Sequence, residues 1–215
     1  MIHPDMATML GFFSCDAGVD PPLWQAMVHR AVKRSFNAIT VDGDTSTNDT
    51  VLAFAAGAAL ADDQYGVLEE GLTAAMQHLA KAIARDGEGA TCLIEVQVEG
   101  AVDDASALSV ARTVCGSSLV KTAVHGRDPN WGRIVAAAGR SGVKFDPEAV
   151  DLWIGGHQLM QAGQPVAFDR DAASASLREE TVLIRLLLGS GPGSGIGWGC
   201  DLSDQYVRIN ADYTT

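Results

Sequence analysis

The sequence predicts a mixed α/β (α+β) protein in which helices dominate the first 85 residues and strands dominate the remainder. Apolar residues recur at helical spacing after Asp20 and again over about residues 65–85. The stretch "LIEVQVEG" at 93–100 instead alternates apolar and polar side chains, which is the period of a half-buried strand. Because the period changes here, we expect two domains, at residues 1–97 and 98–215.

Three helices are expected in the first of these domains. Asp20 followed by Pro21 and Pro22 is a typical helix start, because a carboxylate can cap the first N–H groups and proline lacks one. The segment 50–61 is rich in alanine and glycine and almost uncharged, which indicates a buried helix. The third helix should run from about 65 to 85 and end at "RDGEGA", because glycines end helices.

Strands with a few helices are expected in the second domain. The glycine tract "GSGPGSGIGWG" at 189–199 lacks the i, i+2, i+5 glycine spacing of a dinucleotide-binding loop, so we expect a flexible hairpin there. The apolar patterns predict helices near 104–116 and 171–178, and strands at 93–100, 132–138, 150–154, 165–168, 181–188 and 206–209.

Composition excludes several classes of protein. The chain has 15 basic and 27 acidic residues and a net charge of -12, which argues against a nucleic-acid partner. No signal peptide opens the sequence, and the run "VLAFAAGAALA" at 51–61 is shorter than the roughly 20 residues of a membrane helix. We therefore expect a cytoplasmic protein without a membrane partner. No disulfide framework or metal site is expected, because no CxxC pair occurs among Cys15, Cys92, Cys115 and Cys200.

Three polar stretches could belong to a site or merely to loops. "VDGDTSTNDT" at 41–50 lacks the glycine and final acid of a calcium loop, so it either caps a following helix or lines a pocket. "RDGEGAT" at 85–91 places Glu88 between two glycines, either as a presented carboxylate or in a solvated turn. "HGRDPNWGR" at 125–133 is dense in polar side chains, which fits a structural network or a site.

Thr8 allows two interpretations. It lies in "MATML" at residues 6–10 and could simply be a buried structural threonine. As a nucleophile its hydroxyl would need a base, and no histidine lies at a recognisable triad spacing. An N-terminal threonine can use its own α-amine as the base, which would require the Ala7–Thr8 bond to be broken.

Six stretches, taken in order, resemble a known family. They are "MATML", "FFSCDA", "SFNAITVDGDTSTNDT", "ARDGEGAT", "LVKTAVHGRDPNWGRI" and "WGCDLSDQYVRINADYTT". Over essentially its whole length the chain resembles the ornithine acetyltransferases, the bifunctional glutamate N-acetyltransferases of arginine biosynthesis. It is similar to the β-chain portion, preceded by the last seven residues of the α chain.

The resemblance implies a precursor that cuts itself between Ala7 and Thr8. Thr8 would then be the catalytic nucleophile, taking the acetyl group of N2-acetylornithine and passing it to glutamate in a ping-pong cycle. By the same resemblance the substrate-binding residues would be Thr8, Glu88, Asn210 and Thr215. No cofactor is implied, although acetyl-CoA could serve as a further acetyl donor.

The resemblance also implies a fold and a partner. The fold would be a layered αββα arrangement similar to self-processing, N-terminal-nucleophile-like aminopeptidases, plus a smaller C-terminal α/β domain. Residues 1–97 would form the catalytic half-domain that carries Thr8, and residues 98–215 the C-terminal domain whose end contacts substrate. The partner would be the α chain of the same precursor in an α2β2 assembly. In the family the α chain supplies a threonine–glycine oxyanion hole.

Two alternatives remain at this point. The first is a self-processing amidase or aminopeptidase-like hydrolase that uses water as the acceptor in place of glutamate. The second is an inactive truncated fragment that lacks the α chain. Transfer of acetyl groups to glutamate, as opposed to plain deacetylation, distinguishes the acetyltransferase from the hydrolase.

Overall fold

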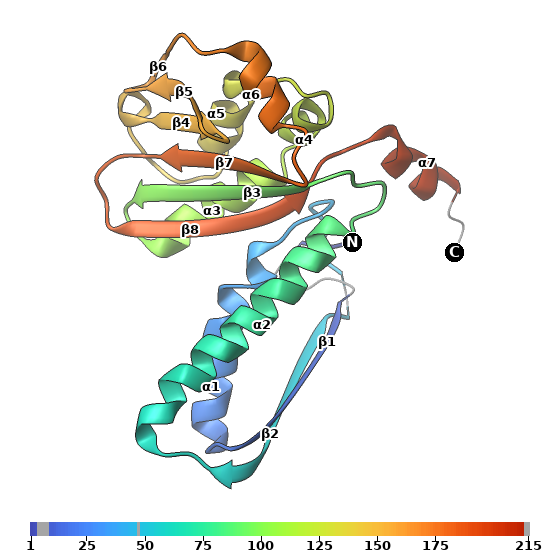
Figure 1. The fold of residues 1–215 in the computed structure, drawn as a ribbon, viewed down its shortest axis with the longest axis vertical. Coiled ribbons are helices and arrows are strands. Elements are labelled where there is room, and N and C mark those ends of the chain that lie inside the picture. The colour runs from blue at the N-terminus through green and yellow to red at the C-terminus, as the bar shows by residue number, and fades with distance from the viewer. Residues whose placement is uncertain (4–8, 47, 213–215) are drawn as a thin grey trace. The chain divides into compact units, whose positions relative to one another are not determined.

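The computed structural model describes residues 1–3, 9–46 and 48–212, which form two compact units (Figure 1). The first unit is Met1–Ala82 and the second begins at Ile83. The boundary expected from sequence, between residues 97 and 98, falls inside a strand, β3 (Leu93–Ala101).

The first unit contains a two-stranded parallel sheet and two long helices. β1 and β2 pair in register from Leu10 opposite Thr50 to Gly18 opposite Ala59, with an irregularity after Cys15. The helices lie side by side, joined by an ion pair of 2.6 Å between Arg30 Nε and Glu69 Oε1 (Figure 1). The elements are β1 (Leu10–Gly18), α1 (Pro21–Lys33), β2 (Thr50–Ala59) and α2 (Tyr65–Arg85), the last of which crosses the boundary.

The helix predicted at 50–61 is wrong, because this segment is strand β2. Alanine has the highest intrinsic helix propensity, but propensity is a small contribution, and pairing with β1 along nearly the whole strand overrides it. Small residues also suit the close approach of the two strands: a Cβ atom on Gly57 would collide with the backbone of Asp16. The other two helix predictions in this region are confirmed. Asp20 precedes α1 as expected, but its side chain makes no capping hydrogen bond.

The second unit is built on a six-stranded sheet with the strand order β6-β5-β4-β7-β3-β8. β3 runs parallel to β7 and antiparallel to β8. Buried side chains of the central strands pack against helices that Figure 1 shows behind the sheet. Besides β3 the elements are α3 (Asp104–Cys115), α4 (Ser118–His125), α5 (Trp131–Gly139), β4 (Asp151–Ile154), β5 (His157–Gln161), β6 (Gln164–Pro165), α6 (Arg170–Ser176), β7 (Thr181–Leu187), β8 (Gly193–Cys200) and α7 (Asp204–Asp212).

Two predicted strands of the second unit are helices. Residues 132–138 belong to α5, which begins where the Asn130 side chain accepts a hydrogen bond from the Arg133 amide at 3.1 Å. Residues 206–209 belong to α7, where Asp204 and Arg208 form an i,i+4 ion pair. The predicted strands at 93–100, 150–154 and 181–188 and the helices at 104–116 and 171–178 are confirmed, whereas β6 covers only the start of 165–168.

The glycine tract forms most of strand β8 and is not a flexible hairpin. A Cβ atom on Gly193, Gly195 or Gly197 would meet the backbone of residues at the start or along one face of α3. The residues concerned recur every four positions: Asp103, which caps α3, and Ala107 and Ala111 within it. Four residues of a helix rise about 6 Å and two residues of a strand about 6.8 Å. Every second residue of β8 therefore meets every fourth residue along α3. The glycines therefore allow α3 to lie directly on β8.

Candidate active site

The segment that contains the expected cleavage point, Ala7–Thr8, lies outside the described residues, as does Thr215. Its neighbours on both sides are described. The Met9 amide donates to Asp49 Oδ1 at 2.6 Å, and the Met9 carbonyl accepts from the Thr50 amide at 2.9 Å. On the other side, the Ile2 amide donates to Asp42 Oδ1 at 2.9 Å.

The stretch at 41–50 therefore holds the chain before and after residues 4–8. It precedes strand β2, so the capping of a following helix is wrong for this stretch. The alternative, pocket lining, is confirmed: Asp49 and Thr50 line a cavity of about 470 Å³ in the first unit.

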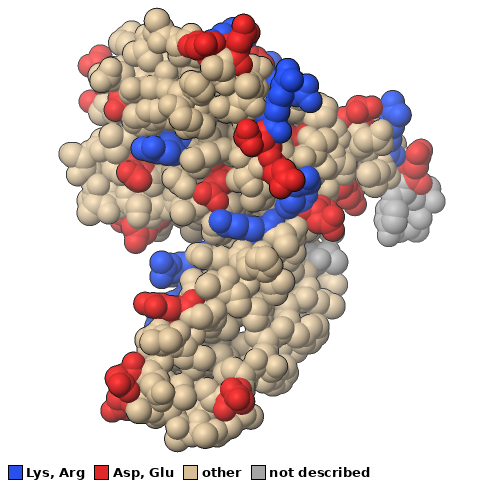
Figure 2. Space-filling model, viewed as in Figure 1, with Lys and Arg blue, Asp and Glu red and all other residues tan. Residues whose placement is uncertain are grey.

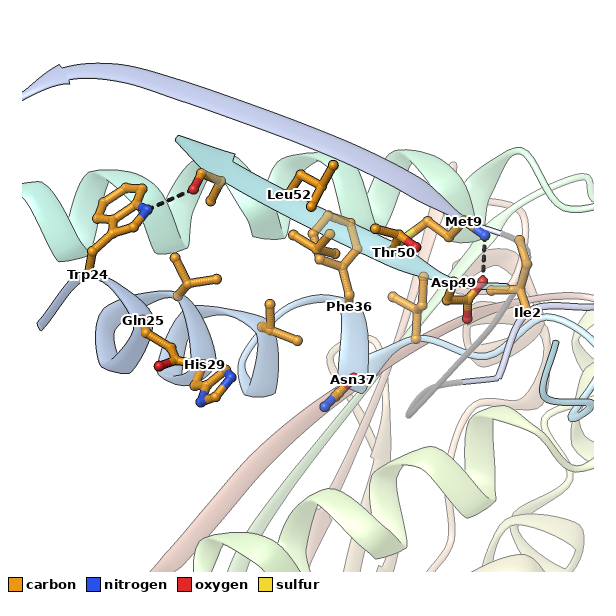
Figure 3. A pocket seen from close by; sticks show the side chains of 15 residues that line it. Ile2, Met9, Trp24, Gln25, His29, Phe36, Asn37, Asp49, Thr50 and Leu52 are labelled. Carbon is orange, nitrogen blue, oxygen red and sulfur yellow. Dashed lines mark hydrogen bonds between the residues drawn. The ribbon is translucent and has the colours of Figure 1, made fainter. Parts of the chain in front are cut away.

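This cavity lies between α1 and β2 and is mostly apolar (Figure 3). Trp24 and His29 stand at one end of it, and Asp49 and Thr50 at the other (Figure 3). The Trp24 indole donates to the Ala53 carbonyl at 2.8 Å, which ties α1 to β2. Met9 also lines the cavity, so the residue directly after Thr8 faces a partly open, mainly apolar space.

In the second unit, Glu88 and Asn210 are brought together. Glu88 is exposed in the turn between α2 and β3, and its Oε2 accepts a hydrogen bond from Asn210 Nδ2 at 2.5 Å. Asn210 is on α7 and also donates to the Tyr206 carbonyl one turn earlier. Two of the substrate contacts expected from sequence are therefore direct neighbours.

Gly89 lets the Glu88 turn pack against the start of α7. Its φ of +69° is in the left-handed region that favours glycine, and a Cβ atom there would lie 2.7 Å from the Tyr206 nitrogen. The Ser203 hydroxyl donates to the Gly89 carbonyl at 2.6 Å. The two glycines seen in sequence thus serve a close approach between two segments as well as a sharp turn.

Asp201 is a buried carboxylate that sequence reasoning did not single out. It follows β8 directly and is 1% exposed. Its Oδ1 accepts from the Thr91 and Cys92 amides, and its Oδ2 accepts from the Thr91 hydroxyl and approaches His125 Nδ1 at 2.7 Å. Burial alone raises the pKa of this carboxyl, but the hydrogen bonds from Thr91, His125 and Cys92 outweigh burial and lower the pKa below its ordinary value.

The polar block 125–133 forms a structural network around the turn between α4 and α5. Arg170 donates to Asp128 at 2.9 Å, and Asn130 donates to the other oxygen of Asp128. Arg133 donates to the Leu119 carbonyl at 3.0 Å. From sequence this block could be a structural network or a site. The structure shows the network, and His125 links it to Asp201.

The cysteines are free thiols. Burial and the nearby Asp201 carboxylate raise the pKa of the Cys92 thiol to about 12, so it is protonated at neutral pH. Within the described parts of the chain, no three His, Cys, Asp or Glu side chains gather as a metal site would require.

A model of the ArgJ family matches residues 1–215, the whole sequence. The chain belongs to the ArgJ family. It is 80% identical over 215 residues to the arginine biosynthesis bifunctional protein ArgJ of Parasynechococcus marenigrum (strain WH8102), covering 53% of that protein. It is 68% identical to the protein of the same name from Prochlorococcus marinus (strain MIT 9313), covering 52%. The chain thus spans about half the length of the curated relatives it matches.

A solved ArgJ structure has the same fold. The crystal structure of the arginine biosynthesis bifunctional protein ArgJ from Bacillus halodurans matches with a TM-score of 0.92 at 45% identity. The match covers 96% of this chain and 100% of the crystallised chain. The mixed α/β class expected from sequence is therefore confirmed. Among the described residues, no helix has the length and apolar character needed to cross a membrane.

Proposed function

We propose that this chain is the β-chain part of a glutamate N-acetyltransferase that moves the acetyl group of N2-acetylornithine to glutamate. Membership of the ArgJ family and the names of the matched relatives support this class of enzyme. The observation that carries the proposal is the contact between Glu88 and Asn210, two expected substrate contacts that lie 122 residues apart in sequence.

In the proposed reaction, Thr8 is the nucleophile and its freed α-amine is the base. The amine takes the hydroxyl proton as Thr8 Oγ1 attacks the acetyl carbonyl. The amide C–N bond then breaks, ornithine leaves with the proton, and the acetyl group stays on Thr8 as an ester. The amine of glutamate attacks this ester, its proton returns to Thr8, and N-acetylglutamate leaves.

Glu88, Asn210 and Thr215 are proposed to bind substrate. A carboxylate such as Glu88 forms charge-assisted hydrogen bonds with the ammonium groups of an amino-acid substrate. Asn210 holds one Glu88 oxygen, which limits the directions in which the carboxylate can point. Such a pre-set carboxylate loses less conformational freedom when substrate binds.

Self-cleavage between Ala7 and Thr8 is part of the proposal. The hydrogen bonds of Ile2 with Asp42 and of Met9 with Asp49 support it, because they fix the chain on both sides of the bond. A bond held at both ends can be kept in the geometry of attack by a neighbouring hydroxyl.

The test uses the complete precursor, meaning this sequence joined to the half that its relatives carry in addition. After incubation with acetyl-labelled N2-acetylornithine, we expect the cut chain to begin at Thr8 and to carry one labelled acetyl group there by mass spectrometry. Added glutamate should remove the label and yield labelled N-acetylglutamate. Thr8→Ala should be neither cut nor acetylated, whereas Thr8→Ser keeps a hydroxyl and should retain both reactions at reduced rates.

Each alternative gives a different result in this experiment. Release of labelled acetate without transfer to glutamate would identify a hydrolase. Full transfer activity in Thr8→Ala would contradict the role of Thr8. Acetylation of the wild-type protein at another residue would do the same.

We further propose that the other half of the precursor covers an exposed apolar face of the β1–β2 sheet. Register places Leu10, Phe12, Leu52 and Phe54 on one face, where they are 41% to 65% exposed. In the view of Figure 2 the first unit also shows few charged side chains. Additional strands packed there would give the layered αββα arrangement, and two such pairs the α2β2 assembly.

This interface can be tested by expressing the two halves together with an affinity tag on the first half. Phe12→Glu should abolish co-purification of this chain, because the buried charge would lack a partner. The matched control is Val67→Glu, a similar change at a side chain of α2 that is 71% exposed, and it should leave co-purification intact. Equal recovery of both variants would contradict the proposed surface.

A further inference from the structure

The Asp201 carboxylate joins three separate segments of the second unit. Thr91 and Cys92 lie where the Glu88 turn enters β3, His125 is the last residue of α4, and Asp201 itself follows β8, shortly before α7. The His125 contact spans 76 residues of sequence and the Thr91 contact 110. A single buried charge thus fixes the Glu88 turn relative to two other elements.

The same turn is tied to α7 by independent contacts. Ser203, two residues after Asp201, donates to the Gly89 carbonyl, and Asn210 donates to Glu88. Any shift of Asp201 would therefore move both ends of the Glu88–Asn210 pair. α7 has no buried residues among those described, so these few polar contacts account for much of its attachment.

His125 is the member of this cluster that comes from outside the turn and α7. Its side chain is 39% exposed, yet Nδ1 lies 2.7 Å from Asp201 Oδ2. The turn after it is held by the Asp128 amide bonded to the Ala123 carbonyl at 2.8 Å and by the Arg170–Asp128 pair. The 125–133 network thereby gives His125 a fixed position from which to hold Asp201.

We propose that His125 and Asp201 are positioning residues for substrate binding, acting through the Glu88 turn and α7 on Glu88 and Asn210. This inference rests on the proposed function, since it assigns these two groups to the substrate site. Neither His125 nor Asp201 need touch the substrate. His125 and Asp201 hold the Glu88 carboxylate in one arrangement, which lowers the entropic cost of substrate binding.

The test compares two replacements of His125 that have nearly the same shape as each other, in the complete, processed enzyme. In His125→Asn the side-chain amide can place an N–H close to the position of Nδ1, whereas leucine in His125→Leu has nearly the shape of asparagine but no donor. We expect His125→Leu to raise the KM for N2-acetylornithine about tenfold, the order of one charge-assisted hydrogen bond. The kcat per acetylatable Thr8 should change less than about twofold, and His125→Asn should recover most of the loss in KM.

A second readout does not depend on turnover. Hydrogen–deuterium exchange should be faster for peptides covering residues 86–92 and 203–212 in His125→Leu, and close to wild type in His125→Asn. An unchanged KM in His125→Leu would overturn the inference, whether or not exchange or the melting temperature changed. Unchanged exchange would overturn it as well.

Failure of the proposed function would be visible separately. Wild-type enzyme that transfers no acetyl group to glutamate contradicts the proposed function before any variant is compared. Exchange at the turn and α7 would still decide whether His125 and Asp201 hold these segments together.

Discussion

Replacing Gly195 with alanine is expected to lower the free energy of unfolding of the second unit by about 2–3 kcal/mol, the upper part of the usual cost of overpacking a core. A Cβ atom at this position would lie 2.6 Å from the Leu108 nitrogen and 2.9 Å from the Ala107 carbonyl carbon. Both are backbone atoms of α3, so no side chain can rotate away to relieve the contact. Either α3 or β8 must move.

Denaturant unfolding followed by circular dichroism measures this effect, and Gly139→Ala is the matched control. Gly139 is the last residue of α5, and a Cβ atom there would have open space around it. Alanine is the better helix former, so this change should be neutral or slightly stabilising. If Gly195→Ala were as stable as Gly139→Ala, this result would contradict the direct packing of α3 on β8.

Local sequence pattern predicted the elements whose burial repeats regularly along the chain. β3 alternates between buried and half-exposed positions, and α3 buries one face, so a short window of sequence identifies each. Prediction from local pattern was wrong for β2 and α7, for opposite reasons. β2 is alanine-rich and becomes a strand through its distant partner β1, whereas the alternating "YVRI" of α7 resembles a strand but has no strand partner in the described residues.

The sequence identified some residues of the candidate site and missed others. Glu88 and Asn210 were both named through the family resemblance, and the structure shows their contact. Asp201 was missed because a single acid after a buried strand has no distinctive spacing, and its partners lie far away in sequence. The available signal was indirect: "HGRDPNWGR" was too polar for an ordinary loop, and it contains His125.

Replacing Asp201 with asparagine is expected to have the largest effect on stability, about 3–5 kcal/mol at neutral pH, the usual cost of removing one partner of a buried charged network. The two backbone amides of Thr91 and Cys92 would lose the charge to which they donate, and one oxygen would become an N–H that faces Thr91 or His125. Unpaired donors in a buried site cost more than the hydrogen bonds themselves contribute.

The pH dependence separates this carboxylate from other sources of stability. Because the pKa of Asp201 is lower in the folded protein than its ordinary value of 3.8, the unfolded chain binds more protons in acid. Its contribution is therefore complete above about pH 5 and is lost as the pH falls through 3.8 towards the folded pKa. Wild-type stability should decline over this range, and Asp201→Asn should decline less.

Asp169→Asn provides the control for this comparison, measured by urea unfolding at a series of pH values. Asp169 caps α6 by accepting from the Ala172 amide at 3.0 Å, and asparagine caps helices about as well, so neutral-pH stability should hardly change. An acid dependence in Asp201→Asn as steep as in wild type would mean that other carboxylates govern acid unfolding. A small neutral-pH loss in Asp201→Asn would show that the four contacts rearrange around the amide, and that the turn carrying Glu88 does not depend on the buried charge.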